Sequence, residues 1–223
     1  MARKKKTSKN PTKILVGVII LLVLGFAGIN APESLYEFFG LTSLIEEVQT
    51  PVSEKNNPGV EDLGKSSFTT EQLQDQAAFI EYEELDSLKR PQGASALLKK
   101  NLINTGTSAN RDIRPPGFIS GEKPYFHSRG HLIGRQLGGS GDDPRNLATL
   151  YQNPVNTPYM TTYENQIRQA MEDNLTVFYQ VKVEYDGNNL FPKAVVLSAK
   201  TLNNPTLDFS VRIYNLQAAD SEN

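Results

Sequence analysis

The sequence contains no cysteine and no tryptophan, and it has only two histidines, His127 and His131. Without cysteine the chain forms no disulfide, no thiolate-bound zinc or iron–sulfur cluster, and no thiol nucleophile. Any reaction that needs an imidazole must therefore use one of these two histidines. With 223 residues the chain is nevertheless long enough to bury a hydrophobic core without cross-links.

Charges of the two signs are separated along the chain, although the net charge is only −2. Residues 1–13 carry six lysines and arginines and no acidic residue, whereas residues 33–86 carry 13 acidic residues against two lysines. Residues 87–223 are modestly basic, with 15 basic against 12 acidic side chains. This last part is compatible with a polyanionic substrate, but its charge alone does not identify one.

One long hydrophobic run, residues 14–31, follows the basic tail of residues 1–13 and is interrupted only by Asn30. Its length is close to the shortest that spans a bilayer, so we expect an uncleaved transmembrane signal anchor. The alternative is a secretory signal peptide that is cleaved near residues 25–27. In both cases the positive charges keep the tail in a bacterial cytoplasm and the rest of the chain is exported, anchored or secreted.

Residues 32–69 are expected to form an acidic linker, because residues 46–70 are rich in Pro, Gly, Ser, Asn and acidic residues and lack hydrophobic periodicity. The folded domain is then expected to occupy residues 70–223. Within it, the composition and the spacing of apolar residues predict helices at 70–89 and 94–100.

A third helix is expected at 157–173, with Thr157 as the N-cap and Pro158 at its first position. Alternating hydrophobic residues predict strands at 176–185, 193–199 and 207–214. We also expect an extended segment at 125–131, and loops in the two glycine- and proline-rich stretches, 104–124 and 134–146.

The two histidines lie four residues apart in His-Ser-Arg-Gly-His, residues 127–131. A helical zinc site is disfavoured, since Pro124 and Gly130 oppose a helix and no third histidine or cysteine completes the ligand set. Farther along, the chain carries three asparagines and an acid–base pair at helical spacing: Asn146, Asn153, Asn156, Glu164 and Arg168. Taken singly, such residues are typical turn formers and an exposed ion pair. Their combination with the histidine motif indicates a catalytic site.

The joint pattern of Ser-Arg-Gly-His at 128–131, Arg-Asn-Leu at 145–147, Asn156, Glu164 and Arg168 resembles the DNA/RNA non-specific endonucleases of the ββα-metal (His-Me finger) class. More narrowly, it is similar to the streptococcal branch of membrane-bound DNA-entry nucleases and secreted streptodornase-type DNases. The resemblance extends from about residue 85 to residue 200. It implies an α+β fold with a ββα-metal nuclease core, in which an antiparallel sheet is flanked by helices.

By this resemblance His131 is the general base, Asn156 is the protein ligand of the metal, and Glu164 is the carboxylate that orients water at the metal. A neutral imidazole suits proton transfer from water, and an amide oxygen suits Mg²⁺, with Mn²⁺ as an alternative. The sequence departs from the common family pattern at two points. Ser128 replaces the usual aspartate, and the interval before Asn156 is one residue longer, so Asn153 is an alternative ligand.

The same resemblance assigns phosphate contacts to Arg129 and Arg168 and a supporting role to Asn146. No base-reading motif is present, so we expect binding through phosphates, which is independent of sequence and weakened by salt. Five further basic residues are candidates for a positively charged nucleic-acid track: Arg111, Arg114, Lys123, Arg135 and Arg145.

The sequence therefore predicts a metal-dependent, sequence-non-specific endonuclease that hydrolyses DNA outside the cell, for uptake or degradation, and leaves 5′-phosphate ends. Single- and double-stranded DNA remain alternatives, as does RNA, and no protein partner is identifiable. The competing hypotheses are a catalytically silent, membrane-anchored nucleic-acid-binding or surface interaction protein, a secreted DNase, and a toxin domain with the same chemistry.

Overall fold

A computed structural model of the chain describes residues 59–120 and 125–217. The expected basic tail, the transmembrane segment and the linker up to residue 58 lie outside the described residues. Within these two ranges, no helix combines the length and the apolar character that crossing a membrane requires.

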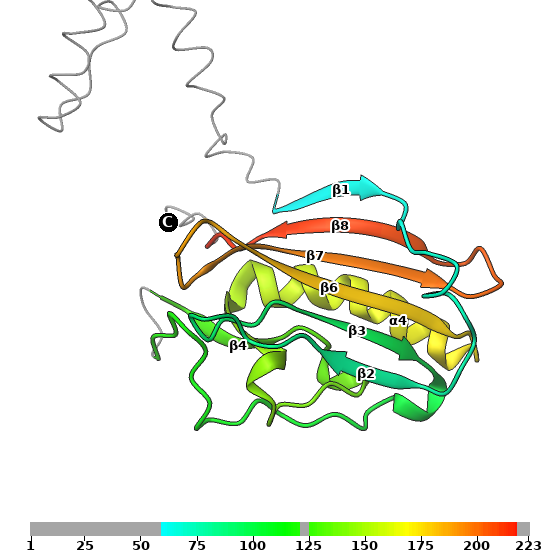
Figure 1. Ribbon diagram of the computed structural model, residues 1–223, viewed down its shortest axis with the longest axis horizontal. Helices are drawn as coiled ribbons and strands as arrows, with labels where there is room; N and C mark the ends of the chain where they lie inside the picture. Colours follow the sequence, from blue (N-terminus) through cyan, green and yellow to red (C-terminus); the bar gives the residue numbers. More distant parts are fainter. Residues whose placement is uncertain (1–58, 121–124, 218–223) are drawn as a thin grey trace, which may run out of the picture. The chain divides into compact units, whose positions relative to one another are not determined.

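A six-stranded antiparallel sheet forms one layer, with the strand order β1-β8-β7-β6-β3-β2 (Figure 1). Its strands are β1 (Val60–Gly64), β2 (Phe79–Tyr82), β3 (Gly93–Leu98), β6 (Val177–Tyr185), β7 (Pro192–Thr201) and β8 (Asp208–Tyr214). The three strands expected in the C-terminal part are thus confirmed within a few residues at their ends. One face of these strands packs on the main core, while Phe178 on the other face of β6 belongs to a second, smaller buried cluster.

The helices expected at 70–89 and 94–100 are wrong, because these segments contribute β2 and β3. Ala94, Ala96 and Leu98 are fully buried on one face of β3, which is hydrogen-bonded to β2 on one side and to β6 on the other. Alanine and leucine favour helices locally, but pairing with a strand about 85 residues away overrides that preference.

Residues 60–64 fall inside the expected linker and instead form β1, which pairs with β8 at the edge of the sheet. The side chain and the amide of Ser66 both donate hydrogen bonds to Asp208 at the start of β8. The described sheet therefore includes residues that precede Thr70.

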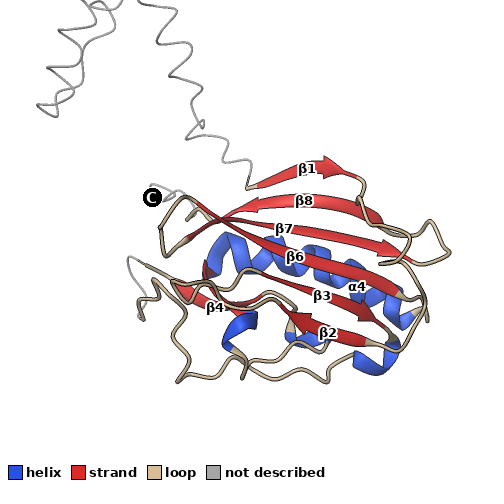
Figure 2. Cartoon of the chain, in the orientation of Figure 1, coloured by secondary structure: helices blue, strands red, loops and turns tan. Residues whose placement is uncertain are grey.

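Helix α4 (Thr161–Glu172) packs on one face of the sheet, as Figure 2 shows. Its buried residues Ile167, Ala170 and Met171 share the main hydrophobic core with strand residues such as Tyr179 and Leu197. The expected helix at 157–173 is thus confirmed only from Thr161 onward. The preceding residues form a π-helical segment, η4 (Gln152–Met160), in which Thr157 has non-helical dihedral angles, so Met160 takes the N-cap position expected for Thr157.

A second, two-stranded sheet pairs β4 (His127–His131) with β5 (Leu147–Tyr151), which confirms the extended segment expected around the histidines. The antiparallel register sets His131 opposite Leu147 and His127 opposite Tyr151. Buried side chains from this pair, η4 and α4 belong to one core: Leu132, Leu150, Val155, Met160 and Ile167. The α+β architecture is as expected, and its β4–β5–α4 unit carries the candidate site. The described residues also contain three short 3₁₀ helices: η1 (Lys100–Leu102), η2 (Arg135–Leu137) and η3 (Pro144–Asn146).

Candidate active site

His131 ends β4 with its ring partly buried, and Nε2 lies 3.0 Å from the main-chain oxygen of Thr107. A carbonyl oxygen only accepts, so Nε2 carries the proton and Nδ1 keeps its lone pair. Burial lowers the pKa of His131, and the positive charge of Arg135 lowers it further, while the bond to Thr107 works in the opposite direction. At neutral pH the ring is therefore a neutral imidazole with one nitrogen available as a base.

Thr107 is itself fixed by the loop that follows β4. Its amide donates to Gly139, and its hydroxyl oxygen accepts from the amide of Gly141 and donates to Asp142. The two loops cross so closely that a side chain on Gly106 would collide with the carbonyl oxygens of Arg135 and Gly139. Both expected glycine-rich loops thus meet at one crossing, and this crossing orients the histidine ring.

Glu164 lies in the first turn of α4, and its side chain is almost completely buried, with 6% exposure. Burial raises the pKa of its carboxyl to about 7, against the hydrogen bonds that it receives from the Gln136 side chain and the Gly134 amide. A carboxyl group held so is close to half-ionised at neutral pH. The buried Tyr179 hydroxyl has no hydrogen-bond partner within the described part of the chain. Burial raises its pKa, and the negative charge of Glu164 raises it further.

Gly134 is required by the position of Glu164, because a Cβ atom built on it would overlap both carboxylate oxygens. Its backbone is ordinary (φ −60°, ψ 148°), so a side chain here would act through space and not through conformation, by displacing the Glu164 carboxylate. We expect Gly134→Ala to lower cleavage activity by roughly 10- to 100-fold, because a displaced carboxylate is misaligned. We also expect the free energy of unfolding to fall by roughly 1–3 kcal/mol through overpacking.

A double-mutant cycle measured by urea denaturation and plasmid cleavage tests this contact. In a Glu164→Ala background, which removes the carboxylate, Gly134→Ala is expected to cost clearly less stability than it does alone. Equal costs in the two backgrounds would show that Gly134 does not matter through Glu164.

Arg168 lies one turn after Glu164 on α4. Its guanidinium donates to Glu172 (Nε to Oε1, 2.9 Å) and to Asn104 (Nη1 to Oδ1, 2.8 Å). The amide of Asn104 in turn donates to the carbonyl oxygen of Gln136. Residues 134–136 therefore interact with all three parts of the expected site. Gly134 donates its amide to Glu164, the charge of Arg135 lowers the pKa of His131, and the carbonyl oxygen of Gln136 accepts from Asn104, which binds Arg168.

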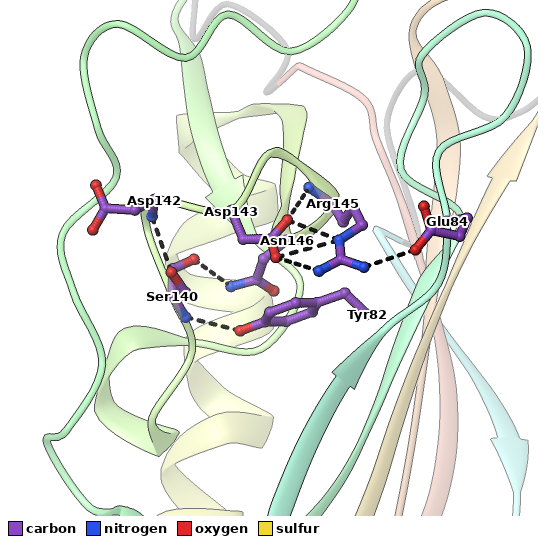
Figure 3. A network of polar contacts seen from close by, with 7 residues as sticks. All are labelled: Tyr82, Glu84, Ser140, Asp142, Asp143, Arg145 and Asn146. Atoms are coloured by element: carbon purple, nitrogen blue, oxygen red, sulfur yellow. Dashed lines mark hydrogen bonds and ion pairs between the residues drawn. The ribbon is translucent and has the colours of Figure 1, made fainter.

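Asn146 is fully buried and makes three side-chain hydrogen bonds to the loop after β4. Its Oδ1 accepts from the amide of Ile133 (2.9 Å), and its Nδ2 donates to the carbonyl oxygens of Ile133 (3.1 Å) and Ser140 (2.8 Å). The bond to Ser140 is visible in Figure 3, where Ser140 also donates from its amide to the Tyr82 hydroxyl. Through these bonds Asn146 fixes the loop that carries Gly134 and Arg135.

The structure does not present Arg145 as a cation available to nucleic acid. Its guanidinium pairs with Asp143 and with Glu84, both at 2.8 Å, as Figure 3 shows. It lies about 6.0 Å from the centre of the Tyr82 ring. The positive charge that was expected to bind phosphate is thus neutralised by ion pairs with two carboxylates of the protein.

Arg129 is also largely engaged within the protein. Its Nε donates to the carbonyl oxygen of Ile113 (2.6 Å), one Nη donates to that of Arg111 (2.9 Å), and the guanidinium lies 4.3 Å from the centre of the Phe118 ring. Only Nη1 has no hydrogen bond among the described residues. Arg129 therefore fastens the loop of residues 111–118 to β4, and a phosphate contact is left to the two hydrogens of Nη1 and the second hydrogen of Nη2.

The other basic residues expected in the nucleic-acid track differ in exposure and in position. Arg111, Arg114 and Arg135 are exposed, and none of them forms an ion pair with another described residue. Arg135 is near enough to His131 to affect its pKa. Lys123 lies outside the described residues.

Asn156, the expected metal ligand, is partly exposed in η4, and its Nδ2 donates to Oε1 of Gln152 (3.3 Å). This bond turns Nδ2 toward the protein, and Oδ1 accepts no hydrogen bond from the described part of the chain. Asn153, the alternative ligand, is exposed in the same segment. Residues 59–120 and 125–217 contain no group of three or more His, Cys, Asp or Glu side chains that could hold a metal.

Residues 69–203, more than half of the chain, match the sequence model of the DNA/RNA non-specific endonuclease family. The chain therefore belongs to this family and is a hydrolytic nuclease, as the resemblance at 128–168 predicted.

Solved nuclease structures share the fold. NucA from Streptococcus agalactiae with a magnesium ion bound is 24% identical, with a TM-score of 0.61 over 76% of this chain and 91% of that one. The same protein with no metal bound gives a TM-score of 0.60 at 24% identity, over 76% and 90% of the two chains. Sda1 nuclease with a bound zinc ion is 20% identical, with a TM-score of 0.62 over 75% of this chain and 93% of that one.

Sequence reasoning missed the residues that hold the catalytic candidates in place, above all Thr107, Gly134, Gln136 and Asn104. Gly134 carried one usable signal, because an isolated glycine directly after a strand often marks a close approach. The other three sit in segments whose partners are about 25 to 65 residues away in sequence, so no local pattern identifies them.

Proposed function

We propose that this nuclease is a Mg²⁺-dependent, sequence-non-specific endonuclease that hydrolyses DNA outside the cell, with His131 as its general base. The observation that carries the proposal is the His131–Thr107 hydrogen bond, because it leaves Nδ1 of a neutral imidazole unprotonated. The magnesium-bound state of NucA supports the choice of metal, and the amide oxygen of Asn156 is a kind of ligand that Mg²⁺ takes. The hydrophobic run at 14–31 supports an extracytoplasmic location, with the anchored form preferred to the secreted one.

In this proposal Nδ1 of His131 takes a proton from the water that attacks phosphorus. The bond between phosphorus and the 3′ oxygen then breaks, so the products carry a 5′-phosphate and a 3′-hydroxyl group. Arg135 is exposed and acts on His131, so it is the cation that a phosphate beside His131 would meet, whereas the Arg168 guanidinium is already paired with Glu172. Mg²⁺, held by Asn156, supplies a positive charge that offsets the negative charge developing on the phosphate.

Cleavage of supercoiled plasmid by the full-length chain tests the proposal. We expect nicking with Mg²⁺, loss of cleavage with EDTA, and products that a 5′-phosphate-dependent exonuclease degrades. Asn156→Ala is expected to raise the Mg²⁺ concentration needed for half-maximal rate, whereas Asn153→Ala is not. The reverse ranking would make Asn153 the ligand, and a wild-type chain that binds DNA without cutting it would favour the catalytically silent alternative.

Substitutions of two arginines distinguish a cation that binds phosphate from one that is held in ion pairs within the protein. Arg135→Gln is expected to weaken binding of duplex DNA in EDTA and to reduce the slope of log affinity against log salt by about 0.9, the value for one lost phosphate contact. Arg145→Gln is the matched control. Because its charge is already paired, it is expected to leave that slope unchanged and to lower the free energy of unfolding slightly.

Fluorescence anisotropy at several salt concentrations and urea denaturation measure the two effects. If Arg145→Gln reduced the salt slope as much as Arg135→Gln does, then the ion pairs of Arg145 would yield to phosphate, and the division drawn here would be incorrect.

A further inference from the structure

An aromatic cluster surrounds His127, at the end of β4 opposite to the catalytic candidate. Ring centroids of four neighbours lie within 6.2 Å of its imidazole: Phe191 (4.9 Å), Tyr151 (5.5 Å), Tyr125 (5.7 Å) and Phe118 (6.2 Å). These rings come from the loop after residue 111, from β4 and the residues before it, from β5, and from the turn before β7. Phe126 follows Tyr125 in the chain and is also exposed, and we call the cluster and this neighbouring ring together the aromatic surface.

Packing of the hydrophobic core does not account for the aromatic surface. Tyr125 is 43% exposed and Phe126 is 36% exposed, and only Tyr151 of these rings packs against the main core. Phe126 also has a positive φ of 47°, a backbone conformation that bulky residues rarely adopt. A strained position that holds an exposed ring is more often maintained for function than for stability.

His127 contributes a neutral ring to this surface. Its Nδ1 accepts a hydrogen bond from the amide of Ile119 (3.1 Å), so its proton is on Nε2. Burial lowers the pKa of His127, which keeps the ring uncharged at neutral pH. Neutral, flat rings of this kind stack on other π-systems and do not act as point charges.

The aromatic surface shares one face of β4 with the catalytic candidate. His127, Arg129 and His131 alternate along the strand, so all three side chains project from the same face. Four residues of extended chain place the aromatic surface about 13 Å from His131. Arg129 lies between them, with its guanidinium 4.3 Å from the centre of the Phe118 ring.

We propose that the aromatic surface binds unpaired bases of a single-stranded nucleic acid, a few nucleotides away from the phosphate that is cut. The proposal rests on the proposed function and names the substrate class of that site. Exposed rings beside a guanidinium form the usual platform for single strands, since every base has a π-face. A duplex hides those faces in its own stack. The exposed cations Arg111 and Arg114, in the loop that Arg129 fastens to β4, fit a polyanionic strand.

Binding of the full-length chain to a fluorescent 20-nucleotide oligothymidylate in EDTA tests the proposal without any cleavage. Tyr125→Ala is expected to weaken single-strand binding roughly 5- to 150-fold, the range for loss of one stacked base. A hairpin duplex of equal charge is expected to lose much less, so that the ratio of single- to double-strand affinity falls at least about fivefold. Tyr125→Phe keeps the ring and is expected to keep the ratio.

Leu63→Ala is the matched control, because Leu63 is 38% exposed on β1, outside the aromatic surface. It is expected to leave both affinities unchanged. Phe126→Ala is the second variant and is expected to lower the ratio in the same direction, and melting curves show whether each variant is folded.

An unchanged affinity ratio in folded Tyr125→Ala and Phe126→Ala would overturn the inference and leave the surface for another partner. Equal losses on both substrates would also overturn it. The outcome is separate from that of the plasmid assay. If the wild-type chain fails to cut plasmid while Tyr125→Ala still lowers single-strand binding selectively, the proposed function is refuted and only the binding of unpaired bases by the aromatic surface is retained.

Discussion

Replacing His131 with alanine is expected to lower the rate of plasmid cleavage by roughly 10²- to 10⁴-fold, the contribution of a positioned general base. No other described histidine can substitute, because the only other one, His127, uses its unprotonated nitrogen to bind the amide of Ile119. Binding of duplex DNA in EDTA is expected to change little, since the imidazole is neutral. A variant that lost binding and cleavage equally would show that His131 holds the substrate and does not act as a base.

The pH profile gives a second measure of the same residue. A base works in its unprotonated form, and the lowered pKa of His131 keeps it unprotonated in more acidic solution than an ordinary histidine. Because activity also needs the ionised Glu164, the rising limb of kcat/KM against pH is expected to combine a His131 component below pH 6.5 with a Glu164 component at about 7, and only the first is expected to be absent from His131→Ala. Added imidazole is expected to restore part of the activity of that variant, and a first component that persisted in the variant would belong to another group.

Replacing Glu164 with glutamine is expected to lower cleavage by at least about 10²-fold, because the amide cannot carry the negative charge that the site uses. The same substitution is expected to stabilise the metal-free protein above neutral pH. A carboxyl whose pKa rises from 4.5 to about 7 on folding costs on the order of 3 kcal/mol when it is ionised. The glutamine avoids that cost, so this variant trades activity for stability.

The direction of the pH dependence follows from the raised pKa. Below about pH 4.5 the carboxyl is protonated in both the folded and the unfolded chain, and it has no effect on their difference. As the pH rises from 4.5 toward 7, the unfolded chain releases the proton first, so the wild-type free energy of unfolding falls relative to Glu164→Gln. Urea denaturation in EDTA across this range measures the gap, and a gap that did not widen with pH would contradict the buried, unpaired state of Glu164.

Local patterns in the sequence were sufficient for part of the fold. The alternation over 176–214 and the helical spacing after Thr161 predicted β6, β7, β8 and α4, because each of these elements buries one face against the core. The same reasoning failed for β2 and β3. Strand β3 pairs with β2 on one side and β6 on the other, and residues on both of its faces are buried. Its apolar residues therefore form a short run that does not alternate, and such a run does not distinguish a strand from a helix.

Composition also could not distinguish between arginines. Arg135 and Arg145 lie in the same basic stretch of sequence, yet Arg135 is exposed near His131 and Arg145 is paired with Asp143 and Glu84. Which carboxylates surround a guanidinium depends on chain crossings such as the one that brings Glu84 to η3. The tertiary structure therefore decides which arginines remain unpaired and able to bind phosphate.

The sequence by itself determined the chemistry available to this protein. With no cysteine and two histidines, the motif at 128–131 and the asparagine, glutamate and arginine that follow it left a nuclease of the DNA/RNA non-specific family as the conclusion, and the family match over residues 69–203 confirms it. The tertiary structure decided how those side chains are tuned. The carbonyl of Thr107 selects the tautomer of His131, the absence of a side chain at Gly134 admits the carboxylate of Glu164, and burial raises the pKa of that carboxyl. These effects arise where segments far apart in sequence meet in a water-poor interior, so their physical cause is contact and desolvation, which no local pattern records.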